Sequence, residues 1–174
     1  MRSAESFYMQ RLVHNSHSSL RQATPDDAPA IAALTDAAYA KYIPLIGRKP
    51  QPMTADYRRM AAEHPIWLLY LGEEPVNEQL AGVLVLELEA ETVLIYSVAV
   101  RPDLQGRGLG HILLEWAEQQ ARQAGYRKMR LYTNEHFVEN IELYTHLGYH
   151  ETGREDYLGT QLVHMARQLE PLAD

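Results

Sequence analysis

Residues 93–100, Val-Leu-Ile-Tyr-Ser-Val-Ala-Val, form a nearly unbroken run of apolar positions. Such a run is typical of a central strand that is covered on both faces. Apolar segments at 66–71 and 80–89 precede it, and the polar stretches at 73–77 and near residue 90 indicate turns. These three segments predict an antiparallel meander. Further short apolar segments predict the remaining strands, at 20–23, 128–132, 149–154 and 162–168.

Apolar residues after residue 108 recur at spacings of three and four, as on one face of a helix. They are Leu109, Ile112, Leu113, Trp116, Ala117, Ala121 and Ala124. The pattern predicts a helix that ends at Gly125. Other helices are predicted at 24–40, with a cap near Thr24, and at 54–63 and 140–147. The segment 42–53 contains Pro44, Pro50, Pro52 and Gly47, and is expected to have no regular structure.

The central strand is joined to the long helix by a glycine-rich loop, Arg101-Pro102-Asp103-Leu104-Gln105-Gly106-Arg107-Gly108-Leu109-Gly110-His111. The three glycines remove the β-carbons that would block a ligand, and they permit positive φ angles that direct several N–H groups toward one point. The start of the helix adds its unpaired N–H groups and its dipole. The loop therefore predicts a cradle for a pyrophosphate.

Two common phosphate-binding motifs do not match this loop. A P-loop requires Gly-Lys-Ser/Thr, but Gly110 is followed by His111 and Ile112. A dinucleotide-binding fingerprint requires a third glycine where His111 stands, and an acidic residue about 20 positions later, where the chain has Arg127 and Lys128. What remains is a Gln-x-x-Gly-x-Gly pattern at residues 105–110.

This pattern, together with the later segment Glu-Asn-Ile-Glu-Leu-Tyr-Thr-His-Leu-Gly-Tyr at 139–149, resembles the GNAT superfamily of acyl-CoA-dependent N-acetyltransferases. The resemblance is strong over residues 80–149. It implies an α+β fold, with a mixed, mostly antiparallel sheet of about six to seven strands flanked by about four helices. One domain over residues 19–170 is expected, preceded by a polar arm at 1–18.

The resemblance also implies the cofactor, acetyl-CoA, and the residues that hold it. In the family the backbone of the central strand, here Val98, Ala99 and Val100, binds pantetheine and the thioester. The loop that holds the pyrophosphate corresponds to Gln105, Gly106, Arg107, Gly108, Leu109, Gly110 and His111. Asn140 is a candidate for the pantetheine arm. Many members place that asparagine seven positions before the tyrosine, where this chain has Phe137, and Asn134 competes for the role.

Two tyrosines are the catalytic candidates that the resemblance suggests. Tyr144 corresponds to a tyrosine that protonates the leaving sulfur, although its position also suits an aromatic anchor of the helix. An alkylamine is neutral in only about one part in a thousand at pH 7, so a base is also required. Many members have a glutamate where this chain has Tyr96, which is expected to order the substrate or to relay a proton through water. Glu87 and Glu89 are alternatives, and the base stays open.

The acceptor is expected to enter along residues 39–57. Tyr42, Asp56 and Tyr57 in this stretch suit a cationic amine, which ring faces and a carboxylate attract. The alternative is a covering loop whose tyrosines fill the core. The predicted reaction is direct transfer of an acetyl group from acetyl-CoA to a primary amine of a small molecule or peptide, in a ternary complex.

Composition and charge bear on the functions that compete with acetyl transfer to a small amine or peptide. The formal net charge of −7, from 16 basic and 23 acidic residues, argues against binding nucleic acid, and so against acetylation of an aminoacyl-tRNA. A non-catalytic acyl-CoA sensor remains the alternative. Without cysteine, secretory leader or membrane-spanning apolar segment, a cytoplasmic protein is expected, either as a monomer or as a homodimer. No metal site is expected, because Gly148 separates His146 from His150.

Overall fold

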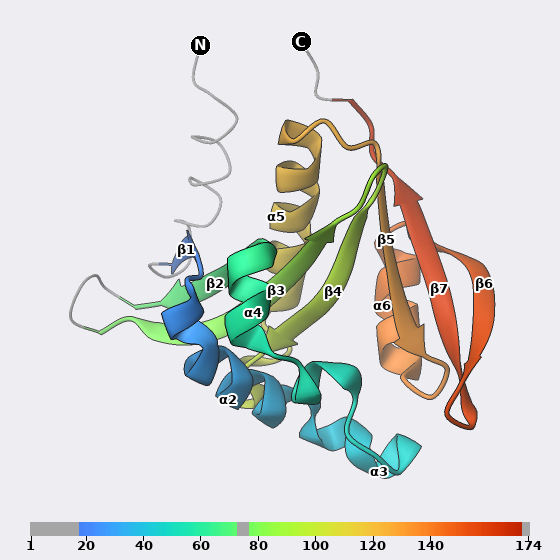
Figure 1. Cartoon of the computed structure of the whole chain (residues 1–174), viewed down its shortest axis with the longest axis horizontal. Helices are drawn as coiled ribbons and strands as arrows, with labels where there is room; N and C mark the ends of the chain where they lie inside the picture. Colours follow the sequence, from blue (N-terminus) through green and yellow to red (C-terminus); the bar gives the residue numbers. More distant parts are fainter. Residues whose placement is uncertain (1–17, 73–76, 172–174) are drawn as a thin grey trace.

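The computed structural model describes residues 18–72 and 77–171, which form one mixed sheet of seven strands with helices on both faces (Figure 1). The strand order is β1-β2-β3-β4-β5-β7-β6. Only β4 and β5 pair in parallel; the other neighbours within the described residues are antiparallel. This architecture is the predicted α+β fold. The predicted arm at 1–18 lies outside the described residues except for Ser18, and the predicted turn at 73–77 does so except for Asn77.

The strands are β1 (Ser18–Gln22), β2 (Ile66–Leu71), β3 (Gln79–Leu88), β4 (Val93–Val100), β5 (Lys128–Asn134), β6 (His150–Tyr157) and β7 (Thr160–Gln168). The helices are α2 (Ala28–Tyr39), α3 (Ile43–Ile46), α4 (Tyr57–Glu63), α5 (Leu109–Gln123) and α6 (Val138–His146). Short 3-10 turns lie at η1 (Pro25–Asp27), η2 (Ala40–Tyr42), η3 (Gln51–Thr54) and η4 (Pro102–Leu104).

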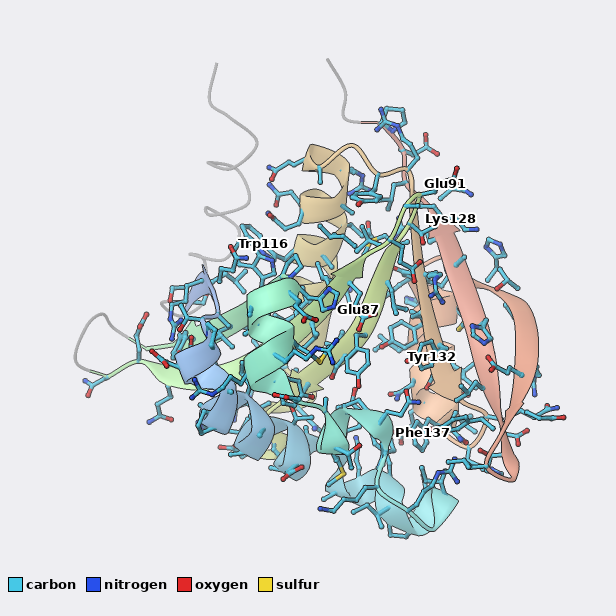
Figure 2. All side chains as sticks on the ribbon, in the orientation of Figure 1. Glu87, Glu91, Trp116, Lys128, Tyr132 and Phe137 are labelled. Carbon is cyan, nitrogen blue, oxygen red and sulfur yellow. The ribbon has the colours of Figure 1, made fainter. Side chains whose placement is uncertain are left out.

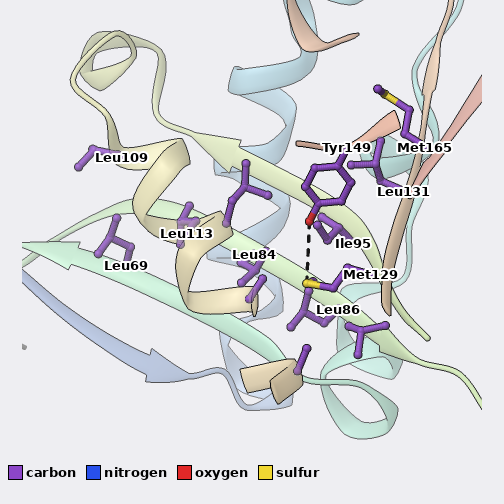
Figure 3. Packing of buried hydrophobic residues seen from close by; sticks show 14 of the residues in the cluster. Leu69, Leu84, Leu86, Ile95, Leu109, Leu113, Met129, Leu131, Tyr149 and Met165 are labelled. Carbon is purple, nitrogen blue, oxygen red and sulfur yellow. Dashed lines mark hydrogen bonds between the residues drawn. The ribbon is translucent and has the colours of Figure 1, made fainter. Parts of the chain in front are cut away.

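Two hydrophobic clusters cover the two faces of the sheet. Under α5 and α6, apolar side chains of the sheet pack against the apolar stripe of α5; Figure 3 shows Leu84, Ile95 and Leu113 among them. On the other face, α2 and α4 cover a second cluster that includes Ile31 and Val83. Because both faces of β3 and β4 are covered, these strands are apolar at nearly every position, as their sequence predicts.

The segment 42–53 is more regular than its prolines suggested. Pro44 occupies the first turn of α3, where its missing N–H breaks no hydrogen bond. Gly47 then ends the helix with φ of +70°. The prediction of an irregular loop was therefore wrong over Ile43–Ile46 and Gln51–Thr54, because proline at the first turn of a short helix favours it.

One extra residue interrupts the pairing of β4 with β3. Ile95 pairs with Leu86 and Ser97 pairs with Val85, so Tyr96 is left without a partner as a β-bulge. The bulge shifts the alternation of side chains by one position. Ile95 and Val98 consequently pack toward the same cluster, whereas a regular strand would place them on opposite faces.

Several tyrosine hydroxyls lie inside this fold. Tyr149 is 2% exposed, and its hydroxyl lies 3.9 Å from the Met129 sulfur (Figure 3). Tyr57 is 4% exposed, and its hydroxyl donates to the Pro52 carbonyl at 2.6 Å. Burial raises the pKa of both phenols above the ordinary value of 10, and it raises the pKa of Tyr39 to about 12.

These shifts predict alkaline instability. In the unfolded chain each phenol ionises near pH 10, whereas in the folded chain it stays neutral to a higher pH. The contribution of each buried tyrosine to the free energy of unfolding is therefore complete below pH 10 and is lost as pH rises toward the folded pKa. Each such tyrosine lowers the free energy of unfolding by up to about 1.4 kcal/mol per pH unit in that window. Urea unfolding between pH 8 and 11.5 measures the slope, and Tyr149→Phe should make it shallower. An equal slope in the variant would contradict the prediction.

Candidate active site

A cleft opens where β4 leaves β5. The two strands pair only at Val93–Met129 and Leu94–Arg130, and in Figure 1 they meet at the top of the view and diverge below. From Ile95 onward the edge of β4 that faces β5 therefore has no partner strand. Backbone groups on such an edge are available to a ligand or to side chains. Tyr39 uses one of them, since its hydroxyl lies 3.5 Å from the Val98 carbonyl and 3.1 Å from the Ser97 hydroxyl.

Two pockets occupy the cleft. The first, the glycine-loop pocket, has a volume of about 1020 Å³ when the space open to solvent is included. Its walls are the end of β4, the loop before α5, the first turn of α5, and parts of α2, η2 and α6. It is lined by every residue predicted to bind the cofactor except Arg107, which is exposed outside it. Those residues are Val98, Ala99, Val100, Gln105, Gly106, Gly108, Leu109, Gly110, His111, Asn140 and Tyr144.

The glycines of the loop adopt the conformations that the sequence suggested. Gly106 and Gly108 have φ of +77° and +82°, which disfavour any side chain. A Cβ atom on either would meet nothing within 4 Å, so the space against the backbone is open. The first bond of α5 runs from the Ile112 N–H to the Gly108 carbonyl at 3.1 Å, so the preceding N–H groups have no partner within the helix. This geometry fits an anionic pyrophosphate.

Side chains around the loop complete this pocket. Gln105 donates to the Val100 carbonyl at 3.1 Å and accepts from Lys41 at 3.3 Å, so it ties the loop to β4 and η2. Lys41 lines the pocket and was not predicted from the sequence, because it is brought there from η2 by the fold. The ring of His111 lies 2.9 Å from Glu115 on α5. Lys41 is the one lysine or arginine among the described residues that line this pocket, and His111 lies at the start of the helix beside it.

The second pocket, the tyrosine pocket, has a volume of about 890 Å³ when the space open to solvent is included. It is lined by Tyr39, Tyr96, Tyr132, Tyr144 and Tyr157, with polar and apolar residues of α3, η3, β5 and α6. Figure 2 shows Tyr132 and Phe137 on the side of β5 and α6, and Glu87 on the side of β3 and β4. The Gln51 amide connects two walls, because it accepts from the Tyr132 hydroxyl and donates to the Tyr157 hydroxyl, both at 3.0 Å.

The two pockets meet at four residues, which we call the junction: Tyr39, Val98, Asn140 and Tyr144. Asn140 is held by Tyr42, whose hydroxyl donates to its Oδ1 at 3.1 Å, and Tyr42 stacks on Phe137 at 4.2 Å between ring centroids. Tyr42, which was expected to bind the acceptor, lines the glycine-loop pocket and not the tyrosine pocket, and it positions a junction residue. Asn134, the competing candidate, lines the tyrosine pocket, and its amide donates to Thr160 at 2.7 Å.

Burial controls the ionisation of Tyr144 at the junction and of Tyr96 in the tyrosine pocket. It raises the pKa of Tyr144 well above 10, so this phenol keeps its proton throughout the physiological range. Burial also raises the pKa of Tyr96 to about 12, with smaller contributions from Tyr132 and Glu87. A neutral Tyr96 can relay a proton but cannot act as an anionic base at neutral pH.

The two glutamates proposed as alternative bases are in different situations. Glu89 is bound by Arg130 through both carboxylate oxygens, and this hydrogen bonding lowers its pKa. Glu87 is in no ion pair within the described residues. Its negative charge helps to raise the pKa of Tyr96 and of Tyr132, which line the tyrosine pocket. Of the two, Glu87 is better placed to receive a proton through water.

Asp56 and Tyr57 line neither pocket within the described residues. Asp56 caps α4, where its side chain accepts from the Arg59 N–H at 3.1 Å. Tyr57 packs in the cluster beneath α2, as described above. This arrangement corresponds to the alternative to an acceptor wall, namely a covering segment whose tyrosine fills the core. Asp56 caps the start of α4, and the ring of Tyr57 occupies an apolar site.

Comparison with known families finds a match to the sequence of this chain. A sequence profile described as "Acetyltransferase (GNAT) family" matches residues 31–149, which include β4, the glycine loop and α6. The chain belongs to the acetyltransferase (GNAT) family. It is therefore an acyltransferase, of the family whose members use acetyl-CoA.

Solved structures support the same fold. The ribosomal-protein-S18-alanine N-acetyltransferase from Escherichia coli is 19% identical, with a TM-score of 0.70 over 91% of this chain and 97% of that one. An acetyltransferase from Thermus thermophilus is 27% identical, with a TM-score of 0.64 over 87% and 97% of the two chains. A GNAT family acetyltransferase from Elizabethkingia anophelis, solved with acetyl-CoA bound, is 18% identical, with a TM-score of 0.65 over 87% and 98%.

Two other kinds of feature are absent from residues 18–72 and 77–171. No helix there combines the length and hydrophobicity needed to cross a membrane. In the same part of the chain, no cluster of three or more His, Cys, Asp or Glu side chains is arranged to hold a metal ion.

The capping role of Asp56 leads to a paired prediction. Asp56→Ala should lower the free energy of unfolding by about 1 kcal/mol, because the Arg59 N–H loses its acceptor, whereas Asp56→Asn should be nearly neutral, because asparagine caps equally well. Neither change should alter KM for an amine. Urea unfolding and steady-state kinetics measure both. A raised amine KM in Asp56→Asn, at unchanged stability, would instead place Asp56 in acceptor binding.

Proposed function

We propose that this protein transfers the acetyl group of acetyl-CoA to a primary amine of a small molecule or peptide, by direct attack in a ternary complex. The observation that supports this most is the junction, where a pocket that fits the cofactor meets a second pocket large enough for an acceptor. Two reactants that enter from opposite sides would meet at Val98 and Tyr144. Holding them together in this way makes the attack effectively unimolecular.

Acetyl-CoA, when bound, supplies a thioester whose carbonyl carbon is electrophilic. The glycine loop and the start of α5 hold the pyrophosphate, with Lys41 adding positive charge. The unpaired edge of β4 at Val98 and Val100, beside Ala99, binds pantetheine and the thioester, and Asn140 helps to orient the arm. Backbone N–H groups fixed on this edge stabilise the negative charge that develops on the carbonyl oxygen, by a few kcal/mol as is usual for such donors.

The reaction forms a C–N bond and breaks the C–S bond, so the amine must lose a proton and the sulfur must gain one. Tyr144 lies at the junction and stays protonated, so its hydroxyl can donate to the departing thiolate. On the opposite side, the neutral Tyr96 hydroxyl orders the amine or relays its proton through water, and Glu87 is the carboxylate that receives it.

Removal of the Tyr144 hydroxyl tests this function. Tyr144→Phe should lower kcat by about tenfold to a thousandfold, because the thiolate loses its proton donor, while the Kd of acetyl-CoA changes by less than about threefold. Free-thiol release with an accepted amine, together with an acetyl-CoA binding isotherm, provides both values. Since the pKa of Tyr144 is raised, kcat should show no loss attributable to this group as pH rises to 10.

Tyr149→Phe is the matched control, because Tyr149 packs edge-on against Tyr144 at 5.9 Å but lines neither pocket. It should keep kcat near the wild-type value. Similar kcat in Tyr144→Phe and the wild type would show that Tyr144 only packs. Tight acetyl-CoA binding with no thiol release from any amine would favour the alternative, a non-catalytic acyl-CoA sensor.

A further inference from the structure

The charge of the tyrosine pocket bears on what the acceptor carries. Among the described residues that line it, the charged side chains are Arg48 and Lys49, and no Asp or Glu is present. Glu87 and Glu155, whose charges act on the pKa of Tyr132, do not line it either. A cationic pocket is unexpected in a chain with a formal charge of −7, and it would repel a polyamine.

Arg48 is bonded only to neutral oxygens within the described part of the chain. Its Nη1 donates to the Leu158 and Ile46 carbonyls at 3.0 and 3.5 Å, and its Nη2 donates to the Tyr157 carbonyl at 3.4 Å and to the Thr160 hydroxyl at 3.5 Å. The guanidinium also lies 5.3 Å from the centre of the Tyr157 ring. No carboxylate there forms an ion pair with it. These contacts hold the planar group in place at the β6–β7 turn and leave its charge uncompensated.

A guanidinium held in this way is suited to a carboxylate, because its positive charge has no counter-ion and its Nε–H makes no hydrogen bond within the described residues. Arg48 lines the tyrosine pocket but does not belong to the junction, so an anion bound to it leaves the junction free for the reacting amine. The acceptor would then have its amine at the junction and its negative group on the Arg48 side of the pocket. Ile46, Pro52, Phe137 and Leu158 supply apolar surface that can cover its side chain.

We propose that the acceptor is an amine that carries a carboxylate, of the amino acid class, and that Arg48 selects it by binding that carboxylate. The inference rests on the proposed function and specifies its acceptor. It also replaces our expectation of a cationic amine recognised by Asp56, because that carboxylate caps α4 while two cations line the pocket.

Matched acceptors test the proposal. Thiol release from acetyl-CoA is measured with each of the twenty amino acids, with its carboxamide and with the corresponding decarboxylated amine. The three compounds share the amine and side chain but differ in the negative charge. For the accepted side chains, kcat/KM should be about tenfold to a hundredfold higher for the amino acid than for its carboxamide, the range expected when one charged hydrogen-bonding group is lost.

Arg48→Gln should reduce that preference to within about threefold of unity, while kcat/KM for the carboxamide changes little. Arg48→Lys should keep an intermediate preference, since it retains the charge but loses the contacts that hold the guanidinium in place at the β6–β7 turn. Because the readout is a ratio measured on one protein sample, partial misfolding lowers both rates and leaves the ratio unchanged. Arg154→Gln is the control: it removes a positive charge from β6 without touching the pocket, and should keep the wild-type preference.

Equal or better rates with the carboxamides or decarboxylated amines would overturn the proposal and leave acetyl transfer itself intact. A preference that persists in Arg48→Gln, or that Arg154→Gln reduces equally, would also overturn it. No thiol release with any of these compounds, when polyamines or peptides are acetylated, would exclude the amino acid class. No release with any amine at all would contradict the proposed function, and this inference would fail with it.

Discussion

The separation of β4 from β5 is the constraint on which the whole site depends. Hydrogen bonding between these two parallel strands stops after Leu94, and the bulge at Tyr96 turns the rest of β4 away from a regular ladder. An unpaired strand edge inside a protein is costly unless something binds it. Tyr39 binds part of this edge, and the rest of it faces two pockets, so the same break in the sheet opens both the glycine-loop pocket and the tyrosine pocket.

The two clusters of the core keep this opening in place. Helix α5 is fixed against β3 and β4 by its apolar stripe, which determines where its first turn and the glycine loop lie. Helix α2 is fixed on the other face and carries Tyr39 to the edge of β4. The polar groups of the cleft are bonded to one another across long sequence distances, as in the contacts of Gln51 with Tyr132 and Tyr157. Such a network gives the tyrosine pocket a preorganised shape.

Local signals in the sequence predicted the conformation of the glycine loop. The strand, the loop and the helix are consecutive, and Gly106 and Gly108 have the positive φ angles that their spacing suggested. The acceptor side could not be predicted in the same way. The bulge at Tyr96 depends on the register between two strands, and Arg48 meets Leu158 from 110 positions away in the chain. Asp56 and Tyr57 were assigned from a local motif, but their environment is decided by the packing of α4.

The central claim, that the glycine loop and the edge of β4 hold acetyl-CoA, is tested most directly by calorimetry on Gly110→Val. Gly110 has no left-handed backbone angle, and the nearest atom to an added Cβ is Val100 Cγ2 at 4.0 Å, so the fold can accept the change while the side chain enters the pocket. We expect acetyl-CoA affinity to fall by at least about tenfold. Gly153→Val, which adds the same group to β6 outside both pockets, should bind as the wild type does. Wild-type affinity in Gly110→Val would contradict the account.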